Sequence, residues 1–144
     1  MRTVARTLGP LLALGLFAAT AVHAADPAPA KDAAEQRYTR AYDKCLGSAG
    51  GQSTMGMNAC TDAELKIQDA ALNAAYRKAM KDLNPRQKAK LQAAQRAWIA
   101  FRDAECASYE DPDWGSLSTI NASACVLHMT VLRLIDLENY PPAT

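Results

Sequence analysis

Four cysteines follow an apolar N-terminal stretch in this chain of 144 residues, and they constrain the fold more than any other feature. An even number of cysteines in an exported chain predicts disulfide bonds rather than free thiols. The spacing contains no Cys-x-x-Cys pair, so neither a thioredoxin-like redox site nor a cysteine-rich zinc site is expected. We therefore expect two structural disulfides, formed by Cys45, Cys60, Cys106 and Cys125.

The first 24 residues have the features of a secretory signal peptide. Arg2 and Arg6 supply the positive region, and the apolar stretch after them is too short to span a bilayer. The small or apolar residues of Val22-His23-Ala24 predict cleavage after Ala24. The expected location is therefore the periplasm or the exterior of the cell.

The remainder is expected to comprise a flexible leader over residues 25–31 and one domain over residues 32–140. Because no cysteine closely follows the apolar stretch, we expect no lipid anchor. We also expect no later segment to be apolar enough to span a membrane.

The charge balance and the single remaining histidine exclude several classes of function. Without Arg2 and Arg6, the chain carries 14 basic and 15 acidic side chains, whereas a nucleic-acid-binding domain normally has a basic excess. One histidine, His128, and four oxidised cysteines do not readily assemble a Ser-His-Asp or Cys-His site. No glycine-rich phosphate loop is present. We expect no catalytic residue, no cofactor, no metal site and no nucleic-acid partner.

The hydrophobic periodicity is helical beyond the leader. In the second predicted helix, Leu65, Asp69, Leu72 and Tyr76 follow the 3-4 spacing of one helix face. Short connections favour antiparallel neighbours. The sequence therefore predicts an all-α fold, a small up-down antiparallel bundle of three to four helices stapled by disulfides. The expected helices span residues 32–46, 53–83, 85–108 and 118–139, the last three capped by Ser53 or Thr54, by Asn84 before Pro85, and by Ser118.

A few polar side chains interrupt the apolar stripes. Asp69 lies 15 residues before Asn84 and Arg102 lies 18 after it, so a hairpin brings them within roughly 4–5 Å along the helix axis. We interpret them as an ion pair that fixes helix register, with Arg133 as a second candidate partner; a ligand-binding polar core is the alternative. The predicted polar core comprises Asp69, Gln95, Trp98, Arg102 and Arg133.

An alternating bundle places all four cysteines at one end. Cys45 and Cys60 bracket one interhelical loop, and Cys106 and Cys125 bracket another, which favours these two pairs. Cys60 and Cys106 are also nearly level across the hairpin, so geometry alone leaves the pairing open.

The segment between Arg102 and Gly115 is acidic and contains two aromatic residues. One interpretation is a solvated loop with an aromatic side chain tucked into the end of the bundle. The other is a contact surface for a basic partner, with aromatic anchors and electrostatic steering. The candidate partner-binding residues are Tyr109, Glu110, Asp111, Asp113 and Trp114.

Several of these residues also form a recognisable pattern. Met57-Asn-x-Cys60, Asp69-x-x-Leu72-Asn73-x-x-Tyr76 and Leu91-x-x-Ala-Gln95-Arg-Ala-Trp98-Ile-x-Phe-Arg102-Asp-x-x-Cys106 resemble the LprI-like domain, long described as a domain of unknown function. Gly115-Ser116, Cys125, Thr130 and Arg133-Leu134 continue the resemblance, which covers about residues 42–137.

The resemblance implies a bacterial envelope protein. The family takes its name from a lipoprotein described as a lysozyme inhibitor, so lysozyme or another basic protein is the implied partner. The present chain differs by lacking a lipoprotein cysteine. A structural or interaction module that binds another protein, a toxin or a small ligand is the alternative function.

Overall fold

The computed structural model describes residues 32–140, and the expected signal peptide, its cleavage site at Ala24 and the leader lie outside them. Within residues 32–140 the chain forms α-helices and short 3₁₀-helices and contains no strand. In chain order the elements are η1 (Glu35–Arg37), α1 (Arg40–Leu46), η2 (Gly50–Gln52), α2 (Thr54–Lys81), α3 (Pro85–Ala107), η3 (Pro112–Trp114) and α4 (Ser116–Glu138).

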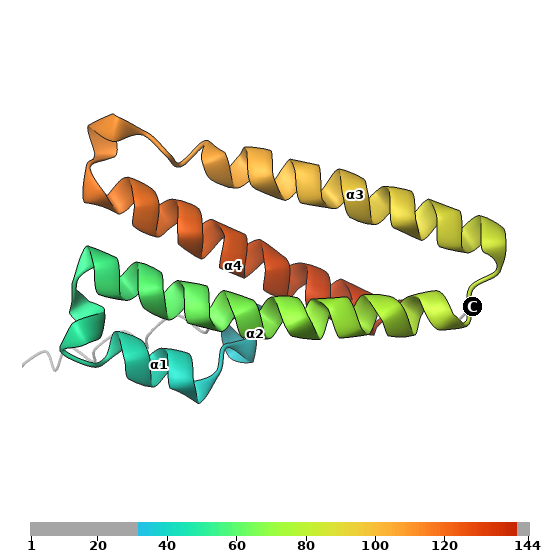
Figure 1. Cartoon of the computed structure of the whole chain (residues 1–144), viewed down its shortest axis with the longest axis horizontal. Coiled ribbons are helices and arrows are strands. Elements are labelled where there is room, and N and C mark those ends of the chain that lie inside the picture. Colours follow the sequence, from blue (N-terminus) through green and yellow to red (C-terminus); the bar gives the residue numbers. More distant parts are fainter. Residues whose placement is uncertain (1–31, 141–144) are drawn as a thin grey trace, which may run out of the picture.

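The three long helices α2, α3 and α4 run in alternating directions along one axis, and the short α1 lies beside the first part of α2 (Figure 1). The most extensive helix pair is α2 with α4, whereas α3 packs against α4 more than against α2. This arrangement confirms the expected all-α, disulfide-stapled bundle.

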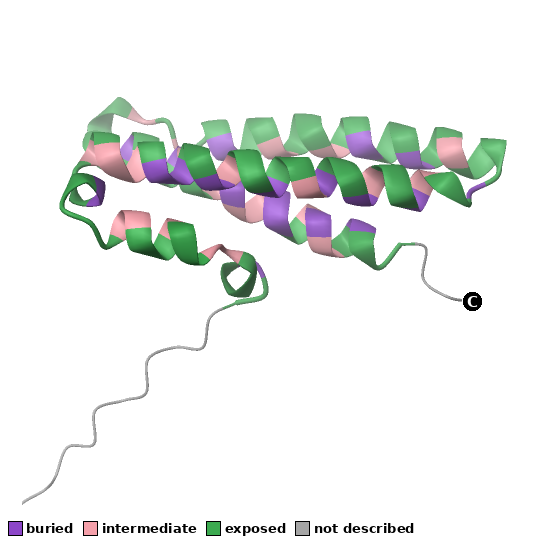
Figure 2. Ribbon diagram, turned by 60° about the horizontal axis from the view of Figure 1, so that its bottom comes forward, coloured by how far each residue is buried: buried purple, intermediate pink, exposed green. Residues whose placement is uncertain are grey.

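The hydrophobic core lies mainly between α2 and α4. Leu72, Ala75 and Ala79 of α2 pack in one cluster with Leu134 and Leu137 of α4. The small alanines allow close approach of the two helices, and each buried leucine contributes about 1.5–3 kcal/mol. The buried positions follow a stripe along α2 and the facing side of α4, while most of the outer faces are exposed (Figure 2).

Helix α4 is long and apolar enough, by length and composition alone, to cross a membrane. The expectation that no segment after the N-terminal stretch would be apolar enough to span a membrane was therefore wrong. The reason is the core role of α4: Leu127, Val131 and Leu134 are each at most 1% exposed. A third of the apolar stretch is buried in this way, and exposed leucines such as Leu117 and Leu132 also raise the mean hydropathy of the helix.

The first expected helix is interrupted. The chain makes the 3₁₀ turn η1, extends at Tyr38 with ψ 143°, and then starts α1 with Thr39 as its N-cap. The Thr39 side chain accepts a hydrogen bond from the Tyr42 backbone N–H. A local cap thus ends what the periodicity suggested was one continuous helix.

Two of the three expected caps are present. Ser53 caps α2 by accepting from the Gly56 N–H, and Asn84 forms a reciprocal capping box with Gln87 at the start of α3. The prediction that Ser118 caps α4 was wrong, because α4 begins two residues earlier, at Ser116. The residue before it is Gly115, whose φ of 58° favours glycine, and the Ser118 hydroxyl instead donates to the Tyr109 carbonyl.

The structure pairs Cys45 with Cys60 and Cys106 with Cys125, with Cα–Cα distances of 5.8 and 5.5 Å. These are the pairs that bracket the interhelical loops, and the alternative of Cys60 with Cys106 does not occur. Both loops lie at the same end of the bundle (Figure 1). The covalent constraints are therefore concentrated where α1 meets α2 and where α3 meets α4.

Candidate partner-binding site

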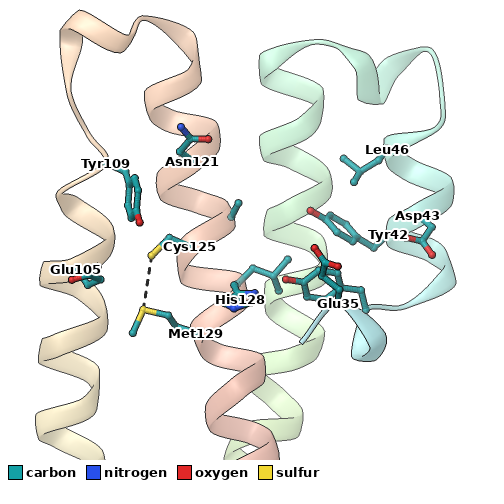
Figure 3. A pocket seen from close by; sticks show the side chains of 13 residues that line it. Glu35, Tyr42, Asp43, Leu46, Glu105, Tyr109, Asn121, Cys125, His128 and Met129 are labelled. Atoms are coloured by element: carbon teal, nitrogen blue, oxygen red, sulfur yellow. Dashed lines mark hydrogen bonds between the residues drawn. The ribbon is translucent and has the colours of Figure 1, made fainter. Parts of the chain in front are cut away.

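A groove of about 820 Å³ runs across α4, between the α1 segment on one side and the end of α3 on the other (Figure 3). It contains carboxylates, tyrosines and apolar side chains from four elements. Its lining residues are Glu35, Tyr38, Tyr42, Asp43, Leu46, Glu105, Tyr109, Asn121, Ala124, Cys125, Leu127, His128 and Met129.

One wall of the groove is held by a buried carboxylate. Glu64 of α2 is 2% exposed, and its oxygens accept hydrogen bonds from the Thr39 backbone N–H at 2.9 Å, the Thr39 hydroxyl at 2.5 Å and the Gln68 amide at 2.7 Å. These bonds fix the start of α1 on α2. Tyr38 and Tyr42 flank Thr39 and meet edge to face, with ring centroids 5.3 Å apart.

The opposite wall is braced by the second disulfide. Cys125 lines the groove, and the Met129 thioether lies 3.7 Å from the Cys106 sulfur and 3.8 Å from the Cys125 sulfur (Figure 3). Both cysteines are oxidised and carry no proton, so we interpret these approaches as sulfur–sulfur contacts rather than hydrogen bonds. They place a compact, polarisable surface at the floor of the groove.

The groove is electronegative. Its lining includes Glu35, Asp43 and Glu105, and no lysine or arginine among the described residues. His128 also lines it, with its Nδ1 3.7 Å from a carboxylate oxygen of Asp32. An excess of acidic over basic side chains around a concave surface gives that surface a negative potential.

Tyr38 lies in this part of the groove, where burial and nearby negative charges both raise its pKa. The pKa of Tyr38 is raised to about 12, first by burial and then by the negative charges around it, among them those of Asp32, Glu35 and Glu64. Each of these carboxylates disfavours a phenolate at that position. The same field favours a positively charged group in the groove.

The acidic loop adjoins the groove, and one of its five candidate residues lines it. Tyr109 faces the groove, and its ring lies 6.5 Å from that of Trp114 between centroids. Asp111 accepts a hydrogen bond from the Asp113 N–H at 2.9 Å and so caps η3. Glu110 and Asp113 are exposed, and Trp114 is 50% exposed. The loop thus presents its carboxylates and an indole to solvent at the rim.

The predicted ion pair between Asp69 and Arg102 was wrong. Asp69 is exposed and accepts a hydrogen bond from Asn73, while Arg102 pairs with Asp103 at 2.7 Å. The reason is the position of α3, which packs on α4 more than on α2 and leaves Asp69 exposed at the pocket between α2 and α3. Arg133 was the second candidate partner of Asp69. Its Nη1 lies instead 3.9 Å from Oδ2 of Asp136.

The other predicted polar-core residues meet between α3 and α4. Gln95 accepts a hydrogen bond from Arg133 at 2.9 Å, and the guanidinium groups of Arg102 and Arg133 lie 5.1 and 5.9 Å from the Trp98 ring centroid. Arg102 also reaches the Thr130 hydroxyl at 3.4 Å. This network links α3 to α4, the pair whose register it can fix.

The comparisons with known proteins bear on the whole domain. A family model described as "Lysozyme inhibitor LprI" matches residues 45–137. The chain belongs to the LprI lysozyme-inhibitor family. Its matched segment includes all four cysteines, the polar network around Trp98 and the acidic loop, while Glu35, Tyr38 and Tyr42 of the groove lie before it.

Within the curated proteins, the chain is similar to an uncharacterized protein of Rhizobium meliloti (strain 1021). The two are 33% identical over 101 residues, which covers 60% of this chain and 72% of the relative. No solved structure matches the chain. Among residues 32–140, no group of three or more His, Cys, Asp or Glu side chains is placed to hold a metal ion.

Proposed function

We propose that this protein is exported to the bacterial envelope and acts there without catalysis, by binding and inhibiting a lysozyme. Membership of the LprI lysozyme-inhibitor family supports the class of target. The acidic groove is the observation that carries the proposal, because an acidic surface complements a basic enzyme.

The groove can receive a basic side chain of the enzyme. Glu35 and Glu105 lie on its two sides, so an arginine or lysine entering between α1 and α3 would meet a carboxylate on either wall (Figure 3). Tyr42 and Tyr109 supply aromatic surfaces beside these carboxylates. Aromatic rings and acidic groups together suit guanidinium recognition, since they combine ion pairing with cation–π contact.

The acidic loop extends this surface. Trp114 is half exposed next to Tyr109, and tryptophan is among the residue types that most often form binding hot spots. Glu110 and Asp113 add exposed negative charge. They accelerate the encounter with a basic enzyme more than they strengthen the final complex.

The direct test is an inhibition assay. It measures the rate at which lysozyme lyses bacterial cell walls in the presence and absence of the purified protein. We expect the wild type to slow lysis, and the Glu35→Gln/Glu105→Gln variant to inhibit at least about tenfold more weakly, as expected for losing about 1.4 kcal/mol or more from two charged contacts. A second variant, Trp114→Ala, tests the rim separately. Absence of inhibition by the wild type at micromolar concentrations overturns the proposal for the lysozyme tried.

A matched control removes the same charge elsewhere. Asp62 and Asp82 are exposed on α2 and at its C-terminal cap, and neither lines the groove. The Asp62→Asn/Asp82→Asn variant should inhibit nearly as well as the wild type. Equal losses in both double variants would show that net charge, rather than the groove, governs inhibition.

A further inference from the structure

A second pocket, of about 280 Å³, lies between α2 and α3 and shares no lining residue with the groove. It contains three of the polar residues that interrupt the predicted apolar stripes. Its lining residues are Asp69, Leu72, Asn73 and Tyr76 of α2 and Gln92, Gln95, Arg96, Trp98, Ile99 and Arg102 of α3.

One largely buried side chain in this pocket has a hydrogen-bond donor that no group in the described part of the chain uses and that is open to solvent. Gln95 is 9% exposed, and its carbonyl oxygen accepts from the Arg133 guanidinium, which fixes the orientation of the amide. Its amide nitrogen therefore remains a donor, and it has no protein partner within residues 32–140. The side chains of Tyr76, Gln92 and Arg96 also line the pocket and form no hydrogen bond within the described part of the chain.

The two walls of the pocket carry opposite charges that do not neutralise each other. Asp69 on α2 bonds only to Asn73, and Arg96 on α3 has no ion pair among the described side chains. Arg102 is already paired with Asp103. A carboxylate therefore faces the pocket from one helix and an unpaired guanidinium from the other.

We propose that this pocket binds a small zwitterion that carries an amino group and a carboxylate, such as an amino acid or a dipeptide. Asp69 accepts from the ammonium group, and Arg96 with the Gln95 amide nitrogen donates to the carboxylate. A ligand with only one charge would bond to one wall alone, whereas a zwitterion can form charge-assisted hydrogen bonds with both walls. The volume is slightly below that of pockets for drug-sized ligands, which fits a molecule of this size.

The remaining lining suits the aliphatic part of such a ligand. Leu72 and Ile99 offer apolar surface from the two helices, and Tyr76 and Trp98 offer ring edges or faces. The amide of Gln92 can bond to a peptide group, which a dipeptide has and a single amino acid lacks. A dipeptide and a single amino acid can thus be distinguished by their affinities for the pocket.

The test is a titration of the oxidised protein followed by the NMR signals of its two indole N–H groups. Trp98 lines this pocket, whereas Trp114 lies on the acidic loop and serves as an internal control. The probes are alanine and alanyl-alanine, with alaninamide, N-acetylalanine and N-acetylglucosamine as comparisons that carry one charge or none. We expect alanine or alanyl-alanine to shift the Trp98 signal, with Kd on the order of 1 mM or tighter, and to leave Trp114 unmoved.

The singly charged and neutral probes should bind at least about tenfold more weakly. Asp69→Asn and Arg96→Gln replace exposed side chains and should each weaken zwitterion binding to a similar degree, while Asp62→Asn should not. The proposal is overturned if neither zwitterion shifts Trp98, if N-acetylglucosamine or a blocked alanine binds as tightly, or if both pocket variants bind like the wild type. Lysozyme inhibition is a separate measurement, so either proposal can fail alone.

Discussion

Glu64 and Thr39 are joined by two hydrogen bonds, because the buried carboxylate accepts from both the backbone N–H and the hydroxyl of Thr39. Gln68 donates a third, so this carboxylate accepts three hydrogen bonds from the protein. The same Thr39 hydroxyl oxygen caps α1 by accepting from the Tyr42 N–H. A carboxylate from α2 thereby fixes the helix that carries one wall of the groove.

We predict that Glu64→Gln lowers the free energy of unfolding by about 1–3 kcal/mol, since an amide offers one acceptor oxygen where the carboxylate offers two. Urea unfolding followed by circular dichroism measures this loss. Asp62→Asn, an exposed change on the same helix, is the control and should be nearly neutral. If Glu64→Gln is as stable as Asp62→Asn, the bonds to Thr39 do not anchor α1.

The residues around Glu64 show what the sequence could and could not predict. The predicted stripe on α2 contained Leu65, Asp69, Leu72 and Tyr76, whereas the buried positions are Glu64 and Gln68 followed by Leu72. Polar side chains thus occupy the core face in the first half of α2. A prediction that follows apolar residues selects Leu65 instead of its buried neighbour Glu64, and so places the buried face of α2 one residue too late. The 3-4 spacing of Glu64 and Gln68 was the available signal.

The groove could not be predicted from the sequence for a different reason. Four helices and two capping sites follow from local spacing, which the chain encodes in short segments, and the same spacing favours the two disulfide pairs without excluding the alternative. Glu35 and Glu105 line opposite sides of one groove only because the segment with η1 and α1 folds back along α2, and no local pattern specifies that arrangement. The acidic loop was found because its residues are contiguous. The predicted pair of Asp69 and Arg102 failed because the helix packing, rather than the helices themselves, was wrong.

The two disulfides should contribute almost equally to stability. They close separations of 15 and 19 residues, for which the chain-entropy model gives about 3 kcal/mol each and a difference of about 0.2 kcal/mol. We expect Cys45→Ser/Cys60→Ser and Cys106→Ser/Cys125→Ser to lower the free energy of unfolding by similar amounts in denaturant titrations. A clearly larger loss in one variant would mean that native contacts, such as those of Met129 with the second pair, add to the entropic effect.

Alkaline titration should detect the ionisation of Tyr38 as a late step. Its folded pKa of about 12 is above the ordinary value of 10, so the neutral phenol is favoured in the folded state. Its contribution to stability is fully present below pH 10 and is lost as the pH rises from about 10 to 12. Ultraviolet absorbance of tyrosinate should show a late step that Tyr38→Phe removes. A Tyr38→Phe variant that retains this late step would assign it to another tyrosine.

Acid should weaken the tie between η1 and the end of α4. Arg37 donates two hydrogen bonds to Glu138, at 2.8 and 2.9 Å, and this bonding lowers the pKa of Glu138. A lowered folded pKa gives stability that is present above the unfolded value of about 4.3 and is lost as the pH falls through the folded value. Both side chains are 41% exposed, so solvent screening limits the contribution to about 0.2–1 kcal/mol.

The measurement for this pair is the unfolding free energy of the wild type and Glu138→Gln from neutral pH down to pH values below about 4. The two proteins should differ at neutral pH and converge in acid. Asp82→Asn, an exposed carboxylate change at the end of α2, should show no such convergence. A difference between wild type and Glu138→Gln that persists in acid would assign the effect to packing rather than to the ion pair.

The salt dependence of lysozyme binding should differ between the acidic loop and the groove. Glu110 and Asp113 are exposed on the loop, so their attraction acts through solvent and is screened within about 10 Å at 0.1 M salt. Glu110→Gln/Asp113→Asn should therefore slow association at low salt and match the wild type at high salt. Glu35→Gln/Glu105→Gln should accelerate dissociation at both, because contacts formed inside the groove are desolvated in the complex. Surface plasmon resonance gives both rates, and identical salt profiles for the two variants would show that the groove and the loop act as one undifferentiated acidic surface.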